Sequence, residues 1–330
     1  MAPSLTRRMF LERTAGAAAA IALTDRAPSA QAAMFISLNG AVAPARTDQR
    51  PNGIGPWPEA ARLAARLRYG GIDWNLGGAK TAGLDATRAL FSEIKIQPTI
   101  VGLPMTAQVA FGDLAAFKQA LPQLADDCAF VAGVGCRRMM LVLTPRSDQP
   151  KDERRALVRE RLAVVGEVLA RSNIRLGLEF LGPLYMRMGG PGGRPGGAPM
   201  VPFIWTLPET VELGKDSGPN VGAVLDVWHW YHSGGTVQDI LATDKSRIVH
   251  VHLSDAREMP AEDVRDNMRL MPGEGAINLT GFLQALRKIG YDGGVAPEPL
   301  GRIAADMGAE DAARLAYDTT LAAMTKAGVI

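Results

Sequence analysis

Apolar runs of strand length alternate with segments of helical period along most of the chain. Eight runs are short and rich in Val, Ile and Leu, and we predict strands at 34–38, 71–76, 94–103, 137–143, 174–180, 221–226, 247–253 and 293–298. No abrupt change of composition between them marks a linker. The alternation therefore predicts a single α/β domain.

Two segments between the predicted strands carry a clear apolar stripe. In 152–170, Asp152 is a candidate N-cap, and one face holds Val158, Leu162, Val165 and Leu169. In 278–290, Asn278 is the candidate cap, Gly290 is placed to end the helix, and the stripe consists of Leu279, Phe282, Leu283, Leu286 and Ile289. Both segments are predicted to be helices that pack on a sheet.

Eight strands that alternate with helices over about 300 residues are typical of a (β/α)8 TIM barrel, with a doubly wound sheet as the main alternative. A doubly wound dinucleotide-binding fold would place G-x-G-x-x-G after the first strand. The residues there, SLNGAVAPA, do not supply it. We therefore predict one TIM barrel over residues 33–330.

Residues 1–32 differ from the rest of the chain. The adjacent arginines Arg7 and Arg8 precede an alanine-rich, weakly apolar segment, and an A-x-A pattern ends at Ala32. This combination resembles a twin-arginine export signal, and a basic N-terminal tail is the alternative. The run is too short and too rich in alanine for a transmembrane helix. We expect an exported or periplasmic soluble protein with no membrane span.

Charge and cysteine content exclude some classes of protein. Removal of residues 1–32 lowers Lys+Arg from 36 to 32 and Asp+Glu from 34 to 32, so the remaining chain is neutral. A nucleic-acid-binding protein is expected to be basic, and we predict no nucleic-acid partner. Cys128 and Cys136 are predicted to be buried thiols, with a disulfide as the less favoured reading. The oligomeric state stays open, and a homo-oligomer is possible.

A glycine-rich segment, GGPGGRPGGAP at 189–199, follows the fifth predicted strand. It lacks the G-K-[ST] ending of a phosphate-binding loop, so we interpret it as a flexible loop. Its position would place it over the carboxyl ends of the strands. A lid and a passive insertion are equally compatible with this pattern.

Ionisable residues stand at the carboxyl ends of the last four predicted strands. They are Glu179, Asp226, His252 and Glu298. In a barrel these ends converge on one site, and buried ionisable groups are costly unless they are paired or bind a metal. Three carboxylates and one imidazole suit a divalent ion such as Mn²⁺, Mg²⁺ or Co²⁺, with Zn²⁺ also possible. We predict one divalent metal ion there, with Mn²⁺ favoured.

Four stretches carry a resemblance to a known family: GLEFLGP, LDVWHWYHSGG, VHVHLSDA and RDNMRLMPGEGAINLTGFLQALRKIGYDGGVAPEP. They resemble the xylose-isomerase-like TIM barrels, which include ketose 3-epimerases and inosose (2-keto-myo-inositol) isomerases. The resemblance covers about residues 174–300, and the N-terminal half matches only in its alternation of strands and helices. Pro297 and Pro299 around Glu298 depart from the family pattern, and we expect the last strand to end there.

The resemblance implies roles for particular residues. The four metal-ligand positions of the family correspond to Glu179, Asp226, His252 and Glu298. The two glutamates would also act as acid and base on opposite faces of a sugar. The resemblance further implies that His229 and Arg257 bind substrate oxygens.

Other residues near these motifs have two interpretations. His250 shares a strand face with His252 and either lines the site or is a hydrogen-bonded barrel histidine. Trp228, with Trp230 and Tyr231, either stacks on a sugar or packs beneath a loop. We interpret His232 as a solvent-facing loop residue and Glu274 as part of a turn with a weaker claim to the site.

These observations predict a divalent-metal-dependent isomerase or epimerase that acts on an unphosphorylated keto-sugar or keto-cyclitol. A carboxylate would remove a proton beside the carbonyl, and the metal would stabilise the resulting enediolate. A 3-keto-glycoside lyase that uses the same enediolate is a close alternative. An abasic-site endonuclease is less favoured, because such sites need more than the four histidines of this chain and the chain without residues 1–32 is neutral. A non-catalytic sugar-binding protein is a further, less favoured alternative.

Overall fold

The computed structural model of the chain describes residues 33–43, 47, 53–188, 200–301 and 307–330. The predicted export signal, residues 1–32, and the glycine-rich segment, residues 189–199, lie outside the described residues. Export and the role of that segment therefore stay predictions. Among the described residues, no helix has the length and apolar character needed to cross a membrane.

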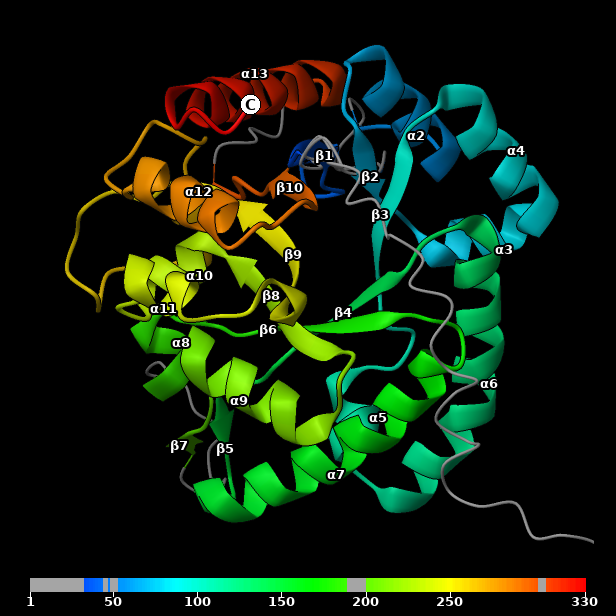
Figure 1. Ribbon diagram of the computed structural model, residues 1–330, viewed down its shortest axis with the longest axis vertical. Helices are drawn as coiled ribbons and strands as arrows, with labels where there is room; N and C mark the ends of the chain where they lie inside the picture. The colour runs from blue at the N-terminus through cyan, green and yellow to red at the C-terminus, as the bar shows by residue number, and fades with distance from the viewer. Residues whose placement is uncertain (1–32, 44–46, 48–52, 189–199, 302–306) are drawn as a thin grey trace, which may run out of the picture. The chain divides into compact units, whose positions relative to one another are not determined.

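The predicted barrel is confirmed (Figure 1). Eight parallel strands close in the order β1-β10-β9-β8-β6-β4-β3-β2. They are β1 (Phe35–Leu38), β2 (Gly71–Asp73), β3 (Gln97–Gly102), β4 (Arg138–Val142), β6 (Arg175–Glu179), β8 (Val221–Asp226), β9 (Ile248–Leu253) and β10 (Gly294–Pro297). Each falls within a predicted strand. The first strand pairs with the last, which closes the ring.

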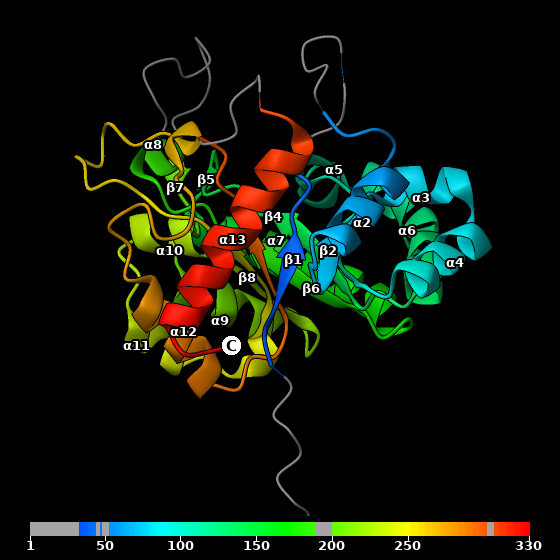
Figure 2. The ribbon, with the colours of Figure 1, turned by 90° about the horizontal axis from the view of Figure 1, so that it is seen from above.

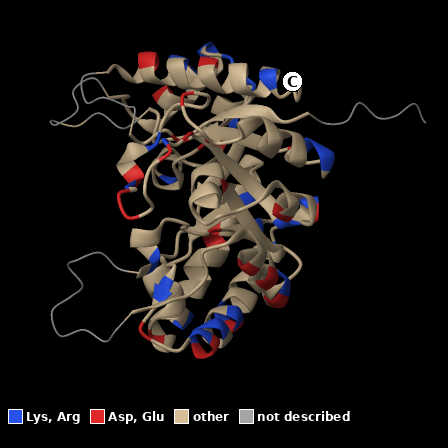
Figure 3. Ribbon diagram, turned by 90° about the vertical axis from the view of Figure 1, so that its left-hand side faces the viewer, with Lys and Arg blue, Asp and Glu red and all other residues tan. Residues whose placement is uncertain are grey.

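Helices surround the barrel (Figure 1). They are α2 (Trp57–Arg66), α3 (Leu76–Ala82), α4 (Leu84–Ile94), α5 (Ala107–Phe111), α6 (Leu114–Val134), α7 (Lys151–Ala170), α8 (Leu184–Met188), α9 (Leu207–Ser217), α10 (Val227–His232), α11 (Val237–Leu241), α12 (Leu279–Lys288) and α13 (Ala309–Lys326). Short 3-10 turns occur at η1 (Lys245–Arg247) and η2 (Asp266–Met268). In the view of Figure 3, acidic and basic residues are interspersed along the helices.

The two helices predicted from apolar stripes are present, and both stripes are buried except for Ile289, which is the half-buried C-cap of α12. Asn278 caps α12 by accepting a hydrogen bond from the Gly281 N–H, and Gly290 follows with φ +80°. The predicted cap of α7 is wrong. The helix begins one residue before Asp152, after Pro150, which has no side chain able to cap, so Asp152 lies in the first turn.

Two strand boundaries differ from the predicted ones by more than one residue. The predicted strand 71–76 ends at Asp73, because the Asn75 side chain accepts a hydrogen bond from the Gly78 N–H and starts α3. The predicted strand 94–103 begins at Gln97, because Ile94 ends α4 and Lys95 adopts φ +56°. In both cases local capping stops a helix or starts one within an apolar run.

The barrel interior is filled by a small set of side chains. Ile100, Val224 and Val249 pack together, with Met140 against them. Gly177 makes room for this layer, since a Cβ there would lie 2.6 Å from Val224 Cγ2. Outside this layer, Cys128 and Cys136 are buried free thiols, as predicted from their number and context. The interior is thus a packed core beneath the carboxyl ends of the strands.

A short two-stranded antiparallel sheet was not predicted. It joins β5 (Arg146–Ser147) to β7 (Val201–Pro202). Figure 2 shows this sheet and α8 together at the end of the barrel toward which β1 points. That end carries the carboxyl ends of all eight strands, because the strands are parallel.

Candidate active site

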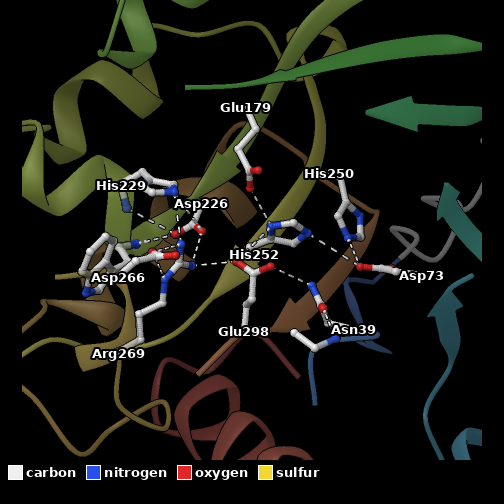
Figure 4. A network of polar contacts seen from close by, with 12 residues as sticks. Asn39, Asp73, Glu179, Asp226, His229, His250, His252, Asp266, Arg269 and Glu298 are labelled. Atoms are coloured by element: carbon white, nitrogen blue, oxygen red, sulfur yellow. Dashed lines mark hydrogen bonds and ion pairs between the residues drawn. The ribbon is translucent and has the colours of Figure 1, made fainter. Parts of the chain in front are cut away.

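The structure brings together the four residues predicted to bind a metal (Figure 4). Glu179 ends β6, Asp226 ends β8, His252 lies in β9, and Glu298 follows β10. One ligand atom from each lies within 4.8 Å of the others. As expected, β10 ends at Pro297, although the Glu298 N–H still bonds to Leu253 O at 2.8 Å.

The four side chains form a compact, largely buried donor set. His252 Nδ1 lies 2.8 Å from Glu179 Oε1 and 3.6 Å from Glu298 Oε2. Asp226 and His252 are each 1% exposed. Three carboxylates and one imidazole nitrogen suit a divalent cation. The residues present therefore fit the predicted ion.

Asp226 serves two purposes through its two oxygens. Oδ1 accepts hydrogen bonds from the N–H groups of Trp228 and His229, at 2.7 and 3.3 Å, and so caps α10. Oδ2 faces the cluster. The start of α10 therefore fixes the carboxylate that points into the site.

An arginine that the sequence reasoning missed lies at the centre of the cluster. Arg269 Nη1 donates to Asp226 Oδ2 and to Glu298 Oε2, each at 2.6 Å. Its Nη2 lies 3.1 Å from His229 Nε2. Arg257, the predicted substrate-binding arginine, is exposed instead. Arg269 belongs to the quoted RLMPGEG run, but no periodic pattern distinguishes it from other loop arginines.

Burial and neighbouring charges shift the pKa values of the carboxyl groups of the cluster in opposite directions. Burial raises the pKa of the Glu298 carboxyl to about 7, against the charges of His252 and Arg269. Burial would also raise the pKa of Glu179, but the hydrogen bond and charge of His252 lower it overall. The charge of Arg269 likewise overcomes burial and lowers the pKa of Asp226. Two neighbouring glutamates thus differ in their affinity for a proton.

The pKa values of His252 and His229 are also shifted in opposite directions. Burial opposes the charged form of His252, but the charge of Glu298 and the contacts with Asp73 and Glu179 raise its pKa well above the ordinary value. Burial lowers the pKa of His229, which favours the neutral ring. The His229 Nδ1 atom is buried without a hydrogen-bond partner among the described residues.

Trp228 of α10 packs against the site, whereas Trp230 packs against Phe282 of α12. Trp228 is 1% exposed, and the Arg269 guanidinium carbon lies 4.7 Å from its ring centroid. Of its two interpretations, the structure therefore favours packing. The interpretation of His232 as a solvent-facing loop residue is wrong. It ends α10, is half-buried, and its ring centroid lies 4.5 Å from that of Trp228.

The N-terminal half contributes an aspartate that was also missed. Asp73 Oδ2 lies 3.1 Å from His250 Nε2 and 3.7 Å from His252 Nε2, and Ser37 Oγ donates to Oδ1 at 2.9 Å. His250 is therefore a hydrogen-bonded barrel histidine beside the site. Asp73 was missed because the predicted strand continued to residue 76, which hid Asp73 inside it.

A cavity of about 170 Å³ opens beside the cluster. Its polar lining includes Asn39, Asp73, His252 and Glu298, and its apolar lining includes Trp74, Ile100 and Met140. Asn39 Nδ2 donates to Glu298 Oε1 at 3.4 Å. The cavity thus has a polar side next to the predicted ligands and an apolar side opposite.

Asp255 anchors the loop that carries Arg269. It is 1% exposed and accepts hydrogen bonds from four backbone N–H groups, those of Ala256, Gly273, Gly275 and Ile277. Its own backbone pairs with Leu270, the residue after Arg269. Glu274 lies in the turn that Asp255 holds, as predicted, and its carboxylate accepts from the Met271 N–H. The HLSD and PGEG motifs therefore form one structural unit.

We expect Asp255→Asn to lower the free energy of unfolding by about 2 kcal/mol or more. The amide would place an NH₂ group against backbone N–H groups that now donate to a carboxylate. Urea unfolding of both proteins measures the difference. Asp263→Asn is the matched control, because Asp263 is exposed on the same loop. Equal stability of the two variants would contradict this role.

The fold and the site together define a class of protein: a closed (β/α)8 barrel with a buried cluster of carboxylates and imidazole at the carboxyl ends of its strands. A model of the family described as xylose isomerase-like TIM barrel matches residues 61–319. The chain belongs to this family, as the resemblance of its motifs indicated.

Comparison with individual proteins agrees with this assignment. An inosose isomerase from Halalkalibacterium halodurans is 36% identical over 119 residues, which is 36% of this chain and 41% of the relative. The match thus spans about two fifths of that relative's length. An inosose isomerase from Bacillus subtilis (strain 168) is 33% identical over 107 residues, or 32% of this chain and 38% of the relative.

Solved structures share the whole barrel. A xylose isomerase domain protein from Alicyclobacillus acidocaldarius has a TM-score of 0.76 at 26% identity, and the match covers 90% of this chain and all of that one. The IolI protein, solved with a bound zinc atom, has a TM-score of 0.72 at 20% identity and covers 89% of this chain and 99% of its own. The second likeness shows the fold alone.

Proposed function

We propose that this protein is a divalent-metal-dependent isomerase or epimerase of an unphosphorylated keto-sugar or keto-cyclitol. One observation carries the proposal: Glu179 Oε1 and Glu298 Oε2 both lie close to His252 Nδ1, at 2.8 and 3.6 Å, within a donor set that fits a divalent ion (Figure 4). Family membership and the names of the inosose isomerase relatives support the same class of reaction.

The metal would be held by Glu179, Asp226, His252 and Glu298. Bound there, it would withdraw electrons from a substrate carbonyl and so acidify the neighbouring C–H group. The removal and return of the proton fall to the two glutamates. One carboxylate takes the proton from one face of the substrate, and the other can return a proton from the opposite face. The same two glutamates could move a proton from one carbon to its neighbour, which is isomerisation. They could also return it to the opposite face of the same carbon, which is epimerisation.

His229 would orient the substrate, and Arg269 would act as a positioning residue, because its five N–H groups already have acceptors within the cluster. Arg269 holds Glu298 and Asp226 in place through its Nη1 group and contacts His229 through its Nη2 group. Because Arg269 can only donate, a neutral His229 accepts at Nε2 and carries its hydrogen on Nδ1, which can donate to a substrate oxygen. The pair would therefore fix the carbonyl end of the substrate relative to the glutamates.

The cavity favours a substrate without a phosphate group. None of the residues that line it is a lysine or an arginine, and two of them, Asp73 and Glu298, are acidic. A phosphate dianion would therefore meet these two carboxylates, with no arginine or lysine in the lining to hold its oxygens. Hydroxyl groups can instead bond to Asn39 and Asp73, while the carbon skeleton contacts the apolar side.

Deuterium exchange tests the proposal. The protein, loaded in turn with Mn²⁺, Mg²⁺, Co²⁺ and Zn²⁺, is incubated in D₂O with keto-sugars and keto-cyclitols, and each substrate's C–H signals are followed by NMR. We expect deuterium beside the carbonyl of at least one unphosphorylated substrate and much slower exchange with its phosphorylated counterpart.

Each alternative has a distinct readout in the same experiment. Release of the C1 substituent from a 3-keto-glycoside would identify a lyase. Nicking of abasic DNA without any exchange would identify an endonuclease. The absence of exchange across the whole panel, with every metal, would overturn the proposed isomerase.

A further inference from the structure

A second cavity lies at the opposite end of the barrel from the candidate active site. It has a volume of about 300 Å³ and is lined by Gln97, Pro98, Gly135, Arg137, Arg138 and Arg175. Gln97, Arg138 and Arg175 are the first residues of β3, β4 and β6. The cavity therefore opens at the amino ends of the strands, where the predicted ligands are absent.

The lining of this cavity is cationic. Three of its six residues are arginines and none is acidic. Arg138 and Arg175 occupy paired positions on adjacent strands, which keeps their charges close together. Burial, followed by the charge of Arg138, lowers the pKa of Arg175. Like charges thus gather here in a partly desolvated region.

The neighbouring groups do not neutralise this charge. Asp292 favours the charged form of Arg175, but it is itself in an ion pair with Lys245, at 3.7 Å. Arg247 adds another positive charge nearby. Among the described residues, no carboxylate forms an ion pair with Arg137, Arg138 or Arg175.

Hydrogen-bond donors also remain in excess. Arg137 Nη1 donates to the carbonyls of Ala132 and Cys136, and Arg175 Nη2 donates to the carbonyls of Ser246 and Ile248. Each guanidinium has five N–H donors, so both keep unused ones. The Arg138 side chain forms no hydrogen bond with the described residues, and its Nε is buried.

We propose that this cavity binds a phosphate group, either as inorganic phosphate or as part of a small phosphate monoester. Guanidinium groups match the oxygens of phosphate in planar, paired hydrogen bonds. Three positive charges without a carboxylate partner favour a dianion over a singly charged ion. The volume is about ten times the share of one water molecule in the liquid, ~30 Å³, so a phosphate with a small substituent fits.

The site has a role separate from the proposed reaction. It lies at the other end of the barrel, and the active-site cavity has no arginine in its lining. A phosphate would supply the negative charge that the partly buried guanidinium groups lack, and so it would bind the folded chain in preference to the unfolded one. The ligand is therefore a stabilising effector and is not a substrate.

Equilibrium dialysis with labelled inorganic phosphate tests the proposal, in EDTA and at constant ionic strength. We expect one saturable phosphate site per chain in the unaltered protein. Arg138→Gln should weaken binding at least tenfold, and Arg138→Lys should give an intermediate affinity, because it keeps the charge but loses the planar fork. Arg88→Gln is the matched control, since Arg88 is exposed on α4 and makes the same change of net charge.

Thermal unfolding gives a second measurement. Phosphate should raise the Tm of the unaltered protein and of Arg88→Gln by a few degrees relative to chloride, and the rise should be lost in Arg138→Gln. Glycerol phosphate in place of inorganic phosphate distinguishes the two sources of the ligand. Unsaturable binding, or binding that Arg138→Gln leaves unchanged, would overturn the proposal whatever the outcome of the deuterium exchange.

Discussion

Glu298→Gln is expected to lower kcat by about 10²- to 10⁴-fold on the substrate that the exchange experiment identifies. The glutamine side chain keeps the shape and one oxygen of glutamate but cannot accept or return a proton. In the proposed reaction Glu298 exchanges a proton with one face of the substrate, and Glu179 acts on the other face. Substrate binding should persist, so the Kd for substrate should change far less than kcat.

The experiment must separate proton transfer from loss of metal. The kcat and substrate Kd are therefore measured at saturating metal, with metal occupancy determined for each variant. Glu258→Gln is the control, because Glu258 is exposed on the loop after β9. A gradual loss of affinity with no specific loss of turnover would instead indicate a non-catalytic sugar-binding protein.

Arg269→Met is expected to lower the free energy of unfolding in EDTA by about 3 to 5 kcal/mol. Arg269 is 2% exposed and bonds to Asp226 and Glu298 at 2.6 Å each. Without the guanidinium, these carboxylates would stay buried close together with no cation between them. A divalent ion in the buffer should restore part of the lost stability, because it supplies positive charge at the same carboxylates.

Urea unfolding with and without metal measures both effects. Arg257→Met serves as the control, since Arg257 is exposed on the same loop and was the arginine expected from the motif alone. We expect it to change stability by less than about 0.5 kcal/mol. If Arg257→Met destabilises the protein and Arg269→Met does not, Arg269 does not neutralise Asp226 and Glu298 in the folded protein.

The strands were predictable because each one is a short apolar run between helical segments. A barrel strand buries both of its faces, so its sequence is apolar throughout and its ends are marked by polar residues. This pattern located β6, β8 and β9 almost to the residue. It located β2 less well, because Trp74 and Leu76 continue the apolar pattern beyond the strand into the start of α3.

The sequence motif alone could not show that Arg269, and not Arg257, lies at the site. Both arginines lie in the loop between β9 and α12, and Arg257 is closer in sequence to the HLSD motif. The Asp255 carboxylate draws residues 273–277 back toward the barrel, and its backbone pairs with Leu270. These bonds place Arg269 over the site. They join residues that no local pattern relates.

The amino-acid sequence by itself determined the barrel, its strands and the four side chains at the ends of β6, β8, β9 and β10. It could do so because the carboxyl ends of parallel strands lie at one end of the barrel. A residue that ends a strand in the sequence is therefore near the other strand ends in space. Only the tertiary structure decided that Arg269, Asp73 and Asn39 complete the site. Asn39 meets Glu298 across 259 residues of chain, because ring closure pairs β1 with β10, and such contacts depend on how the whole barrel closes.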